Sequence, residues 1–393
     1  MRESAAERHD RLLDLVRRRG SARVSDLAGQ LGVSPVTVRR DVEALAGRGL
    51  LDRVHGKVSW PHAEGGAGVP AQGGGAGREL VLGMIAPTAT YYFAEVIRGA
   101  HEAAAAAGAR LVLRISDYRP GEDAARAAGL LAAGAEGLLV APGWKEPHDP
   151  AEHGRWIHEL PVPTVLLERR GVPGGPLDDL DRVCSDHGHG VLLAVRHLTG
   201  LGHRAPLLVA RADSPTALAV RAGYGQALEA LGLTAPHPVL GSVSAEADPA
   251  GFEAVVRALA AAVGSGAVTA ALVHNDVDAI RIAQRLGELG VRVPRDLALV
   301  AYDDEVAALA DTPLTAVAPP KHEVGRYAAR LLVERLRAAG PGGPGEEPRR
   351  HVDLLPRLRV RSSCGAPGPS AGVRARASAA TAPVPDRGTA EVV

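Results

Sequence analysis

The residues that most clearly point to a chemistry lie in the segment Ser34–Leu45, which reads SPVTVRRDVEAL. Ser34 is a good helix N-cap, because its hydroxyl can accept a hydrogen bond from a free amide of the first turn. Pro35 follows at the first helical position, where its missing donor costs nothing. The apolar residues at helical spacing are Val38, Val42 and Leu45. Arg39 and Arg40 point away from that stripe, so the segment predicts a short helix whose basic face enters the major groove of DNA.

Side chains around the two arginines extend this candidate DNA interface. Thr37 lies at the edge of the helix and suits a phosphate or a thymine methyl group. Asp41 lies near the apolar stripe, and we expect it to pair with a neighbouring arginine in a structural role. The candidate DNA contacts are Ser34, Val36, Thr37, Arg39, Arg40, Arg53, His55 and Lys57.

The elements around this helix predict how it is held. In chain order, we expect helices at residues 8–19, 24–31 and 34–45 and strands at residues 49–54 and 57–60. Gly32 suits the turn before the third helix, and His55-Gly56 suits the turn of a two-stranded wing. Residues 1–60 hold twelve Lys and Arg against eight Asp and Glu, an excess of the sign that DNA binding needs. We therefore expect a winged helix-turn-helix domain over residues 1–60.

The remaining chain predicts an α/β fold. Residues 61–78 are rich in Gly and Pro and are expected to form a flexible linker, and residues 364–393 are expected to form a disordered tail. In between, at residues 79–363, short apolar runs alternate with Ala-rich helical stretches such as 94–107 and 218–231. The expected strands are 80–86, 110–115, 137–141, 163–167, 205–210, 269–273 and 297–301. This alternation predicts parallel sheets with helices on both faces, and its length predicts two lobes around a cleft.

Polar and aromatic residues follow these strands at the edge where open α/β sheets bind ligands. The candidate ligand contacts are Tyr91, Tyr92, Phe93, Trp144, Glu168, Arg169, Arg221, Asn275, Asp276 and Asp303. Carboxylates accept hydrogen bonds from hydroxyl groups, Arg and Asn donate them, and an aromatic ring stacks on the C–H face of a sugar. Asp276 or Asp303 could instead be an ordinary helix N-cap, and for each residue both interpretations stay open. As a set, these residues predict a site for a polyhydroxylated molecule.

Composition limits the remaining functions. The 393-residue chain has a formal net charge of zero, which argues against a protein that coats nucleic acid along its length. Cys184 and Cys364 cannot form a disulfide framework, and we recognise no signal peptide or membrane span, so we expect a cytoplasmic protein. His187 and His189 lack partners at metal-binding spacing, so we expect no metal. We find no motif for a cofactor or a catalytic nucleophile and expect no enzyme.

Two stretches of sequence resemble known families. The segment VSPVTVRRDVEALAGRGLLDRVHGKV, within residues 8–58, resembles the DeoR-type helix-turn-helix, with Lys57-Val58 in place of the usual Gly-Ala of the wing. Residues 80–363 resemble the effector domain of LacI/GalR regulators, a relative of periplasmic sugar-binding proteins. The stretches that carry this second resemblance are VCSDHGHGVLLAVRHLTGLGHR, LVHNDVDAIRIAQRLGELGVRVPRDLALVAYDD and DTPLTAVAPPKHEVGRYAARLLVERL.

The second resemblance assigns roles to individual residues. It implies that Asp276 and Asp303 face the effector sugar and that Glu168-Arg169 stands where the family has Asp-Arg. The family's effector-binding arginine falls on Val220 of this chain, and Arg221 follows one residue later. The LacI-type hinge helix is replaced here by a glycine-rich linker.

Together these features predict a sugar- or metabolite-responsive transcriptional repressor. It would bind a palindromic operator in double-stranded DNA as a homodimer, because one small helix contacts too few bases for specificity. The alternative is a cytoplasmic sugar-binding or sugar-modifying module whose N-terminal domain mediates protein contacts.

Overall fold

The computed structural model describes two separately folded units, residues 1–77 and 78–393. The described residues are 9, 11–13, 15–16, 21–34, 37–38, 40–42, 45, 52–54, 57–59, 79–144, 150–171, 173–204, 206–338 and 348–366. The predicted linker at 61–78 therefore lies entirely outside them, as does the predicted tail beyond residue 366. Among the helices of the described part, none has the length and apolarity that crossing a membrane requires.

The first unit has the expected helices and wing. Its regular elements are β1 (Ser21–Arg23), α2 (Val24–Leu31), β2 (Asp52–Val54) and β3 (Lys57–Ser59), and the described residues within 9–16 and 37–45 are helical. Strands β2 and β3 pair antiparallel, as predicted for the wing. Strand β1 was not predicted from the sequence, because three residues are too few to show an alternating pattern. It pairs with β3 through Ala22 and Val58, both of which are buried.

One hydrophobic core holds this unit together. The stripe that the sequence predicts on the third helix is buried, with Val38, Val42 and Leu45 each at most 1% exposed. It packs with residues of the two preceding helices and of the sheet, namely Leu12, Val16, Ala22, Leu27, Ala28, Leu31 and Val58. The third helix is therefore fixed by the burial of its apolar face.

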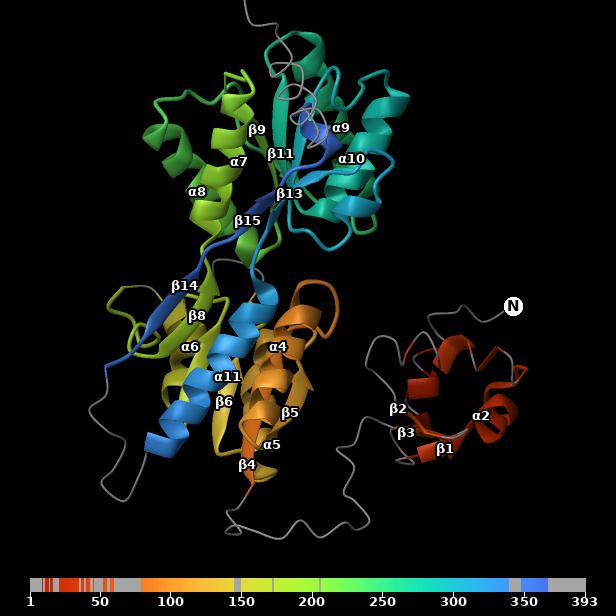
Figure 1. Cartoon of the computed structure of the whole chain (residues 1–393), viewed down its shortest axis with the longest axis vertical. Helices are drawn as coiled ribbons and strands as arrows, with labels where there is room; N and C mark the ends of the chain where they lie inside the picture. The colour runs from red at the N-terminus through yellow and green to blue at the C-terminus, as the bar shows by residue number, and fades with distance from the viewer. Residues whose placement is uncertain are drawn as a thin grey trace, which may run out of the picture. The chain divides into compact units, whose positions relative to one another are not determined.

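The second unit contains two α/β lobes (Figure 1). The first lobe has a six-stranded parallel sheet in the order β14-β8-β7-β6-β4-β5. Its strands are β4 (Leu80–Ala86), β5 (Ala109–Ile115), β6 (Gly137–Val140), β7 (Thr164–Leu167), β8 (Asp181–Ser185) and β14 (His351–Leu354). One face is covered by α4 (Tyr92–Ala106) and α11 (Lys321–Ala338), and the other by α5 (Pro120–Ala132) and α6 (Pro150–His158). Because both faces are buried, the central strands β4, β6 and β7 carry no charged residue and are almost entirely apolar.

The second lobe repeats this architecture. Its strand order is β10-β9-β11-β12-β13-β15, parallel except for β15. The strands are β9 (Leu207–Arg211), β10 (Leu240–Ser242), β11 (Ala270–His274), β12 (Ala298–Tyr302), β13 (Thr315–Ala318) and β15 (Arg357–Arg359). One face is covered by α7 (His187–Gly200) and α8 (Pro215–Ala230), and the other by α9 (Pro249–Gly264) and α10 (Asp276–Glu288). Two short 3₁₀ helices, η1 (Ala307–Leu309) and η2 (Ser362–Cys364), complete it.

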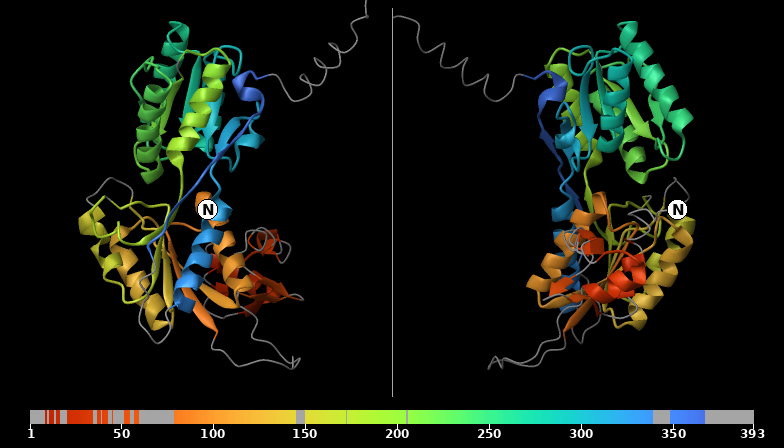
Figure 2. Two further views of the ribbon diagram at one scale, coloured as in Figure 1. Left: turned by 60° about the vertical axis from the view of Figure 1, so that its left-hand side comes forward. Right: turned by 90° about the vertical axis from the view of Figure 1, so that its right-hand side faces the viewer.

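The chain passes between the lobes three times (Figure 2). It leaves the first lobe after β8 to form α7, returns after β13 to form α11, and leaves again between β14 and β15. Each lobe is therefore made of segments that are distant in sequence. The α/β class with parallel sheets and flanking helices is as the sequence predicts, and each of the seven expected strands is present to within two residues at either end.

Three features of this unit differ from expectation. Strands β8, β10, β13, β14 and β15 were not predicted, since they are short or carry charged residues. Helix α4 begins at Tyr92 rather than at residue 94, which places Tyr92 and Phe93 in its first turn. The ordered C-terminal part extends past the predicted limit at residue 363, because Cys364 is buried in η2 against Thr315 of β13.

Candidate ligand cavity and nucleic-acid interface

The helix that carries the candidate DNA contacts starts at the predicted N-cap. The Ser34 hydroxyl accepts a hydrogen bond from the Thr37 amide at 3.1 Å, and the Ser34 carbonyl accepts one from the Val38 amide at 3.1 Å. The Thr37 hydroxyl lies 2.8 Å from the Ser34 hydroxyl, which directs it toward the start of the helix. Arg40 is exposed, on the side away from the buried stripe. This arrangement leaves an arginine at the solvent face of an anchored helix.

The side chains of the other five candidate DNA contacts lie outside the part of the chain that the structure describes. Val36, Arg39 and His55 lie outside the described residues. Arg53 and Lys57 are described only as backbone, in β2 and β3. Their roles remain predictions from the sequence.

Asp41 connects the third helix to the first helical segment of the same unit. Its carboxylate lies 3.0 Å from Nε2 of His9, in the first helical segment, and Asp41 is only 6% exposed. The sequence predicts a structural role with an arginine partner, which stays a prediction, and the structure shows a contact of Asp41 with a histidine that is 32 residues away. This contact fixes the orientation of the Arg40 helix on its support.

A cavity of about 250 Å³ lies at the carboxyl ends of the strands in the second unit, with walls from both lobes. It is lined by Tyr91, Tyr92, Phe93, Tyr118, Glu168, Arg169, Arg211, Asp213, Ser214, Pro215, Thr216, His274, Asn275 and Asp303. This is the edge at which open α/β sheets bind ligands.

Aromatic side chains concentrate at this cavity. Three of the six tyrosines and one of the two phenylalanines line it. The rings of Tyr92 and Phe93 pack edge to face with centroids 5.6 Å apart. In a chain with only 3% aromatic residues, this concentration supplies flat apolar surface beside polar groups, as ligand sites usually do.

The backbone is strained at the same place. Among the described residues, the five non-glycine residues with positive φ are Tyr91, Asp117, Tyr118, Glu168 and Asp303, with φ between 51° and 74°. Four of them line the cavity. Side chains disfavour this conformation, and such strain is typical of functional sites, where surrounding structure holds a residue in a required direction.

Glu168 is the carboxylate that the first lobe contributes to the cavity lining, and it accepts several hydrogen bonds. It accepts hydrogen bonds from the Tyr92 hydroxyl at 2.6 Å, the Ser185 hydroxyl at 2.9 Å and the Ser185 amide at 3.0 Å. Nε2 of His187 lies 3.6 Å away. Burial by itself raises the pKa of Glu168, but these donors and His187 outweigh it and lower the pKa to about 2. Glu168 is therefore a fixed negative charge whose oxygen atoms already have donors.

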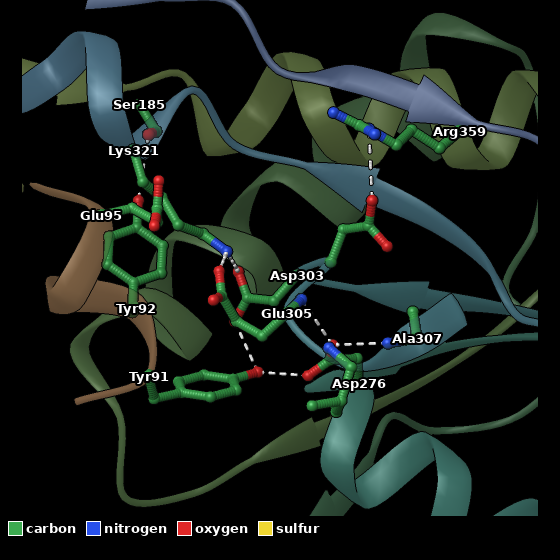
Figure 3. Close-up of polar contacts among 12 residues, drawn as sticks. Tyr91, Tyr92, Glu95, Ser185, Asp276, Asp303, Glu305, Ala307, Lys321 and Arg359 are labelled. Carbon is green, nitrogen blue, oxygen red and sulfur yellow. Dashed lines mark hydrogen bonds and ion pairs between the residues drawn. The ribbon is translucent and has the colours of Figure 1, made fainter. Parts of the chain in front are cut away.

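Asp276 is at the base of the site and does not line the cavity. Its Oδ2 accepts hydrogen bonds from the amides of Glu305, Val306 and Ala307 at 2.7, 2.7 and 3.1 Å (Figure 3). Its Oδ1 accepts one from the Tyr91 hydroxyl at 2.5 Å. The side chain is fully buried. Asp276 is not the cap of α10, because Asn275 takes that position and accepts a hydrogen bond from the Asp278 amide at 3.2 Å.

Asp303 presents a carboxylate oxygen that still needs a donor. Its Oδ1 is buried without a hydrogen bond, at 4.0 Å from Nζ of Lys321, and its Oδ2 lies 3.4 Å from the Tyr91 hydroxyl. Burial raises the pKa of Asp303 to about 6, against the opposing effect of Lys321 and with a further contribution from Asp276. Because Asp303 lines the cavity, a ligand hydroxyl can supply the missing hydrogen bond.

The cationic groups of the cavity are engaged by the protein itself. Arg211 makes a bidentate pair with Asp213, with both distances 2.8 Å. Arg169 donates to the carbonyl groups of Pro142 at 3.1 Å and Glu168 at 2.8 Å. His274 is buried, its Nδ1 has no partner, and burial lowers its pKa to about 3, which keeps it neutral. The cavity is therefore suited to a neutral ligand rich in hydroxyl groups.

The structure brings together seven of the ten ligand candidates that the sequence predicts. They are Tyr91, Tyr92, Phe93, Glu168, Arg169, Asn275 and Asp303. Three do not line the cavity. Trp144 is buried in the hydrophobic cluster of β6, α5 and α6 that also contains Ile85 and Leu130, because burial removes its large apolar ring from water. Arg221 points along α8 to the carbonyl of Ala210 at 2.6 Å, and Asp276 lies behind Tyr91.

Further residues line the cavity besides these seven. Arg211, Asp213 and His274 belong to strand ends of the second lobe, the position at which the sequence predicts polar ligand contacts. Tyr118 lies three residues after β5 and lines the cavity with a positive φ, a backbone conformation for which no sequence signal exists. Among the described residues, no group of three or more His, Cys, Asp or Glu side chains is arranged to hold a metal ion.

Comparison with family models matches both units. Residues 8–64 match the DeoR-like helix-turn-helix domain, and residues 195–364 match the periplasmic binding protein-like domain. The first of these ranges contains the Ser34–Leu45 segment, and the second contains every cavity residue of the second lobe.

Known regulators resemble most of the chain. The HTH-type transcriptional regulator DegA of Bacillus subtilis is 27% identical over 290 residues, which are 73% of this chain and 81% of DegA. The ribose operon repressor of Escherichia coli is 28% identical over 260 residues, 65% of this chain and 75% of that repressor. These relatives are regulators rather than enzymes.

Solved structures agree with the sequence relatives. The transcriptional regulator CelR in its cellobiose complex superposes with a TM-score of 0.58 at 26% identity, covering 84% of this chain and 91% of CelR. The chain is a DNA-binding transcriptional regulator in which a DeoR-like helix-turn-helix domain precedes a periplasmic-binding-protein-like domain similar to those of LacI-family repressors.

Proposed function

We propose that the protein represses transcription from a palindromic operator and that a small sugar or related polyhydroxylated metabolite, bound in the cavity between the lobes, changes its operator affinity. The observation that carries this proposal is the presence in one chain of an N-capped helix with exposed Arg40 and of a cavity with aromatic walls and unpaired acceptors. As a DNA-binding regulator, it would act in the cytoplasm.

The chemistry of the cavity supports a sugar as the ligand. Tyr91, Tyr92, Phe93 and Tyr118 offer rings that can stack on C–H faces. Asp303 offers a carboxylate oxygen without a hydrogen bond, and Asn275 lies beside it in the lining. A few polar groups at fixed positions within an aromatic site give orientation and specificity.

The DNA unit supports binding as a homodimer. One helix of this size contacts few base pairs, and specific affinity needs two half-sites. We expect two copies of the chain to present their helices to successive major grooves of double-stranded operator DNA.

The two lobes supply the means of regulation. A ligand that contacts both walls of the cavity stabilises one relative position of the lobes and so alters the spacing of the DNA units. The change in operator affinity cannot exceed the difference in the ligand's affinity for the two states.

The test is a mobility-shift titration with DNA fragments that flank the gene, followed by a monosaccharide screen by thermal shift. We expect retention of at least one fragment and a change in its affinity with a sugar that stabilises the protein. If no flanking or genomic fragment is retained, or if a tightly bound sugar leaves operator affinity unchanged, the proposal is wrong.

A further inference from the structure

Tyr91 connects the two lobes through the floor of the cavity. It stands between β4 and α4 in the first lobe, whereas Asp276 and Asp303 follow β11 and β12 in the second. The Tyr91 hydroxyl donates to Oδ1 of Asp276 at 2.5 Å, and Oδ2 of Asp303 lies 3.4 Å away (Figure 3). A backbone φ of 53° directs the phenol to this position.

Asp276 connects Tyr91 to a segment of the second lobe that contacts one of the places where the chain crosses between the lobes. Its Oδ2 accepts hydrogen bonds from the successive amides of residues 305–307. The side chain of Glu305 pairs with Lys321, the first residue of α11, where the chain returns to the first lobe. Lys321 also lies over the ring of Tyr92, with Nζ 4.9 Å from the ring centroid. These contacts therefore run from Tyr91 through Asp276 and Glu305 in the second lobe to Lys321. From Lys321 they return to Tyr92, the residue next to Tyr91 in the chain.

The same contact determines which carboxylate a ligand can reach. Asp276 is fully buried and absent from the cavity lining, since Tyr91 covers it. Asp303 lines the cavity with one oxygen free of hydrogen bonds. The Tyr91 hydroxyl occupies the acceptor that a ligand hydroxyl would otherwise use on Asp276.

We propose that Tyr91 is a latch that holds the two lobes together and closes Asp276 to any ligand in the cavity. A ligand in the cavity then donates its hydrogen bond to Asp303 instead of Asp276. This inference rests on the proposed function in assigning a ligand to the cavity, but the contact between Tyr91 and Asp276 does not depend on that assignment.

The test is hydrogen exchange of the ligand-free full chain, read at the amides of residues 305–307. Tyr91→Phe keeps the ring and removes the donor, and we expect exchange at these amides to rise at least fivefold. Small-angle scattering should show a larger radius of gyration. Tyr224→Phe is the matched control, because it removes one phenol hydrogen bond, to the Pro206 carbonyl at 2.8 Å, within the second lobe. It should leave exchange at 305–307 within twofold of the wild type.

A double-variant cycle separates the latch from general destabilisation. Asp276→Asn leaves one carbonyl oxygen for the amides of residues 305–307 and puts an NH2 group in place of the oxygen that accepts from Tyr91, so adding Tyr91→Phe to it should produce little further increase in exchange. Independent, additive effects of the two changes would overturn the latch, as would wild-type exchange in Tyr91→Phe. Operator binding by the same preparations is scored separately. Retained operator binding with unchanged exchange defeats the latch alone, whereas absent operator binding in the wild type defeats the proposed function.

Discussion

Gly325 of α11 packs directly against the backbone of Val96 in α4, so that a β-carbon on Gly325 would lie 1.8 Å from the Val96 carbonyl oxygen. The contact is reciprocal along the helix pair, since a β-carbon on Gly99 would lie 2.0 Å from the carbonyl oxygen of His322. Helix α4, which begins after Tyr91, and helix α11, which begins at Lys321, are thus packed closely together, with a glycine at the contact on each side. Figures 1 and 2 show them side by side on one face of the first lobe's sheet.

Gly325→Ala should lower the free energy of unfolding by about 1–3 kcal/mol, because backbone rather than a flexible side chain must move to make room. Gly225→Ala is the matched control, since it lies within α8 with no atom within 4 Å of its β-carbon position and should stabilise the helix by about 0.5–1 kcal/mol. Urea unfolding of both variants measures the difference. Equal stability of the two variants would show that α4 and α11 are not closely packed.

Arg40→Ala should weaken operator binding by about 1–3 kcal/mol if the side chain contacts a base, and should reduce the salt dependence by about one charge if it contacts phosphate. Arg330→Ala removes the same charge from an exposed position on α11 and should have no such effect. Mobility-shift titrations at several salt concentrations distinguish the two contacts. Unchanged affinity at every salt concentration would contradict the assignment of Arg40, and sugar binding should be intact in both variants.

Asp303→Asn should weaken binding of the sugar that gives the largest thermal shift by about 10- to 100-fold, the usual range for a hydrogen bond to a charged group. Asp303 lines the cavity and one of its carboxylate oxygens has no hydrogen bond, whereas Asp311 is exposed eight residues further along the chain. Asp311→Asn therefore serves as the control. Calorimetry measures both, and equal affinities would remove Asp303 from the site.

His274→Gln should change how stability depends on pH. Burial lowers the folded-state pKa of His274 to about 3, with a smaller contribution from His187, against about 6.5 in the unfolded chain. Between those values the unfolded state binds more protons, so this histidine makes the folded protein less stable as the pH falls. Relative to the variant, the wild type should lose about 2 kcal/mol between pH 7 and pH 5.

The control for this measurement is His101→Gln, at an exposed position on α4. Asp278 and Asp303, whose pKa values burial raises to about 6, are present in both chains and largely cancel in the comparison. Parallel pH curves for wild type and His274→Gln would mean that His274 is not buried in its neutral form.

Ser34→Ala should destabilise the DNA-binding unit by about 1 kcal/mol, because the Thr37 amide loses its acceptor. Ser34→Asp should restore most of that stability, since aspartate caps helices equally well. Thermal unfolding of the first unit, followed by circular dichroism, provides the comparison. If the aspartate variant is no more stable than the alanine variant, the capping assignment is wrong.

The sequence by itself determined the features that depend on neighbouring residues. The cap at Ser34 and the buried stripe of Val38, Val42 and Leu45 follow from spacing along one helix, and the structure confirms them. The predicted strands were recognisable because a parallel strand buried on both faces must be apolar throughout its length. The polar residues after those strands indicated the correct edge of the sheet, because each follows the carboxyl end of its own strand.

Only the tertiary structure decided which of those polar residues face the cavity. Trp144 and Tyr118 both follow strands of the first lobe, yet one packs in the core and the other lines the cavity. Asp276 and Asp303 look equivalent in the sequence, but Tyr91, 185 residues from Asp276 along the chain, covers the first and leaves an oxygen of the second free. The pattern of neighbouring residues in the sequence cannot predict this difference between Asp276 and Asp303. The difference arises because two lobes built from interleaved segments bring side chains that are distant in the sequence into contact.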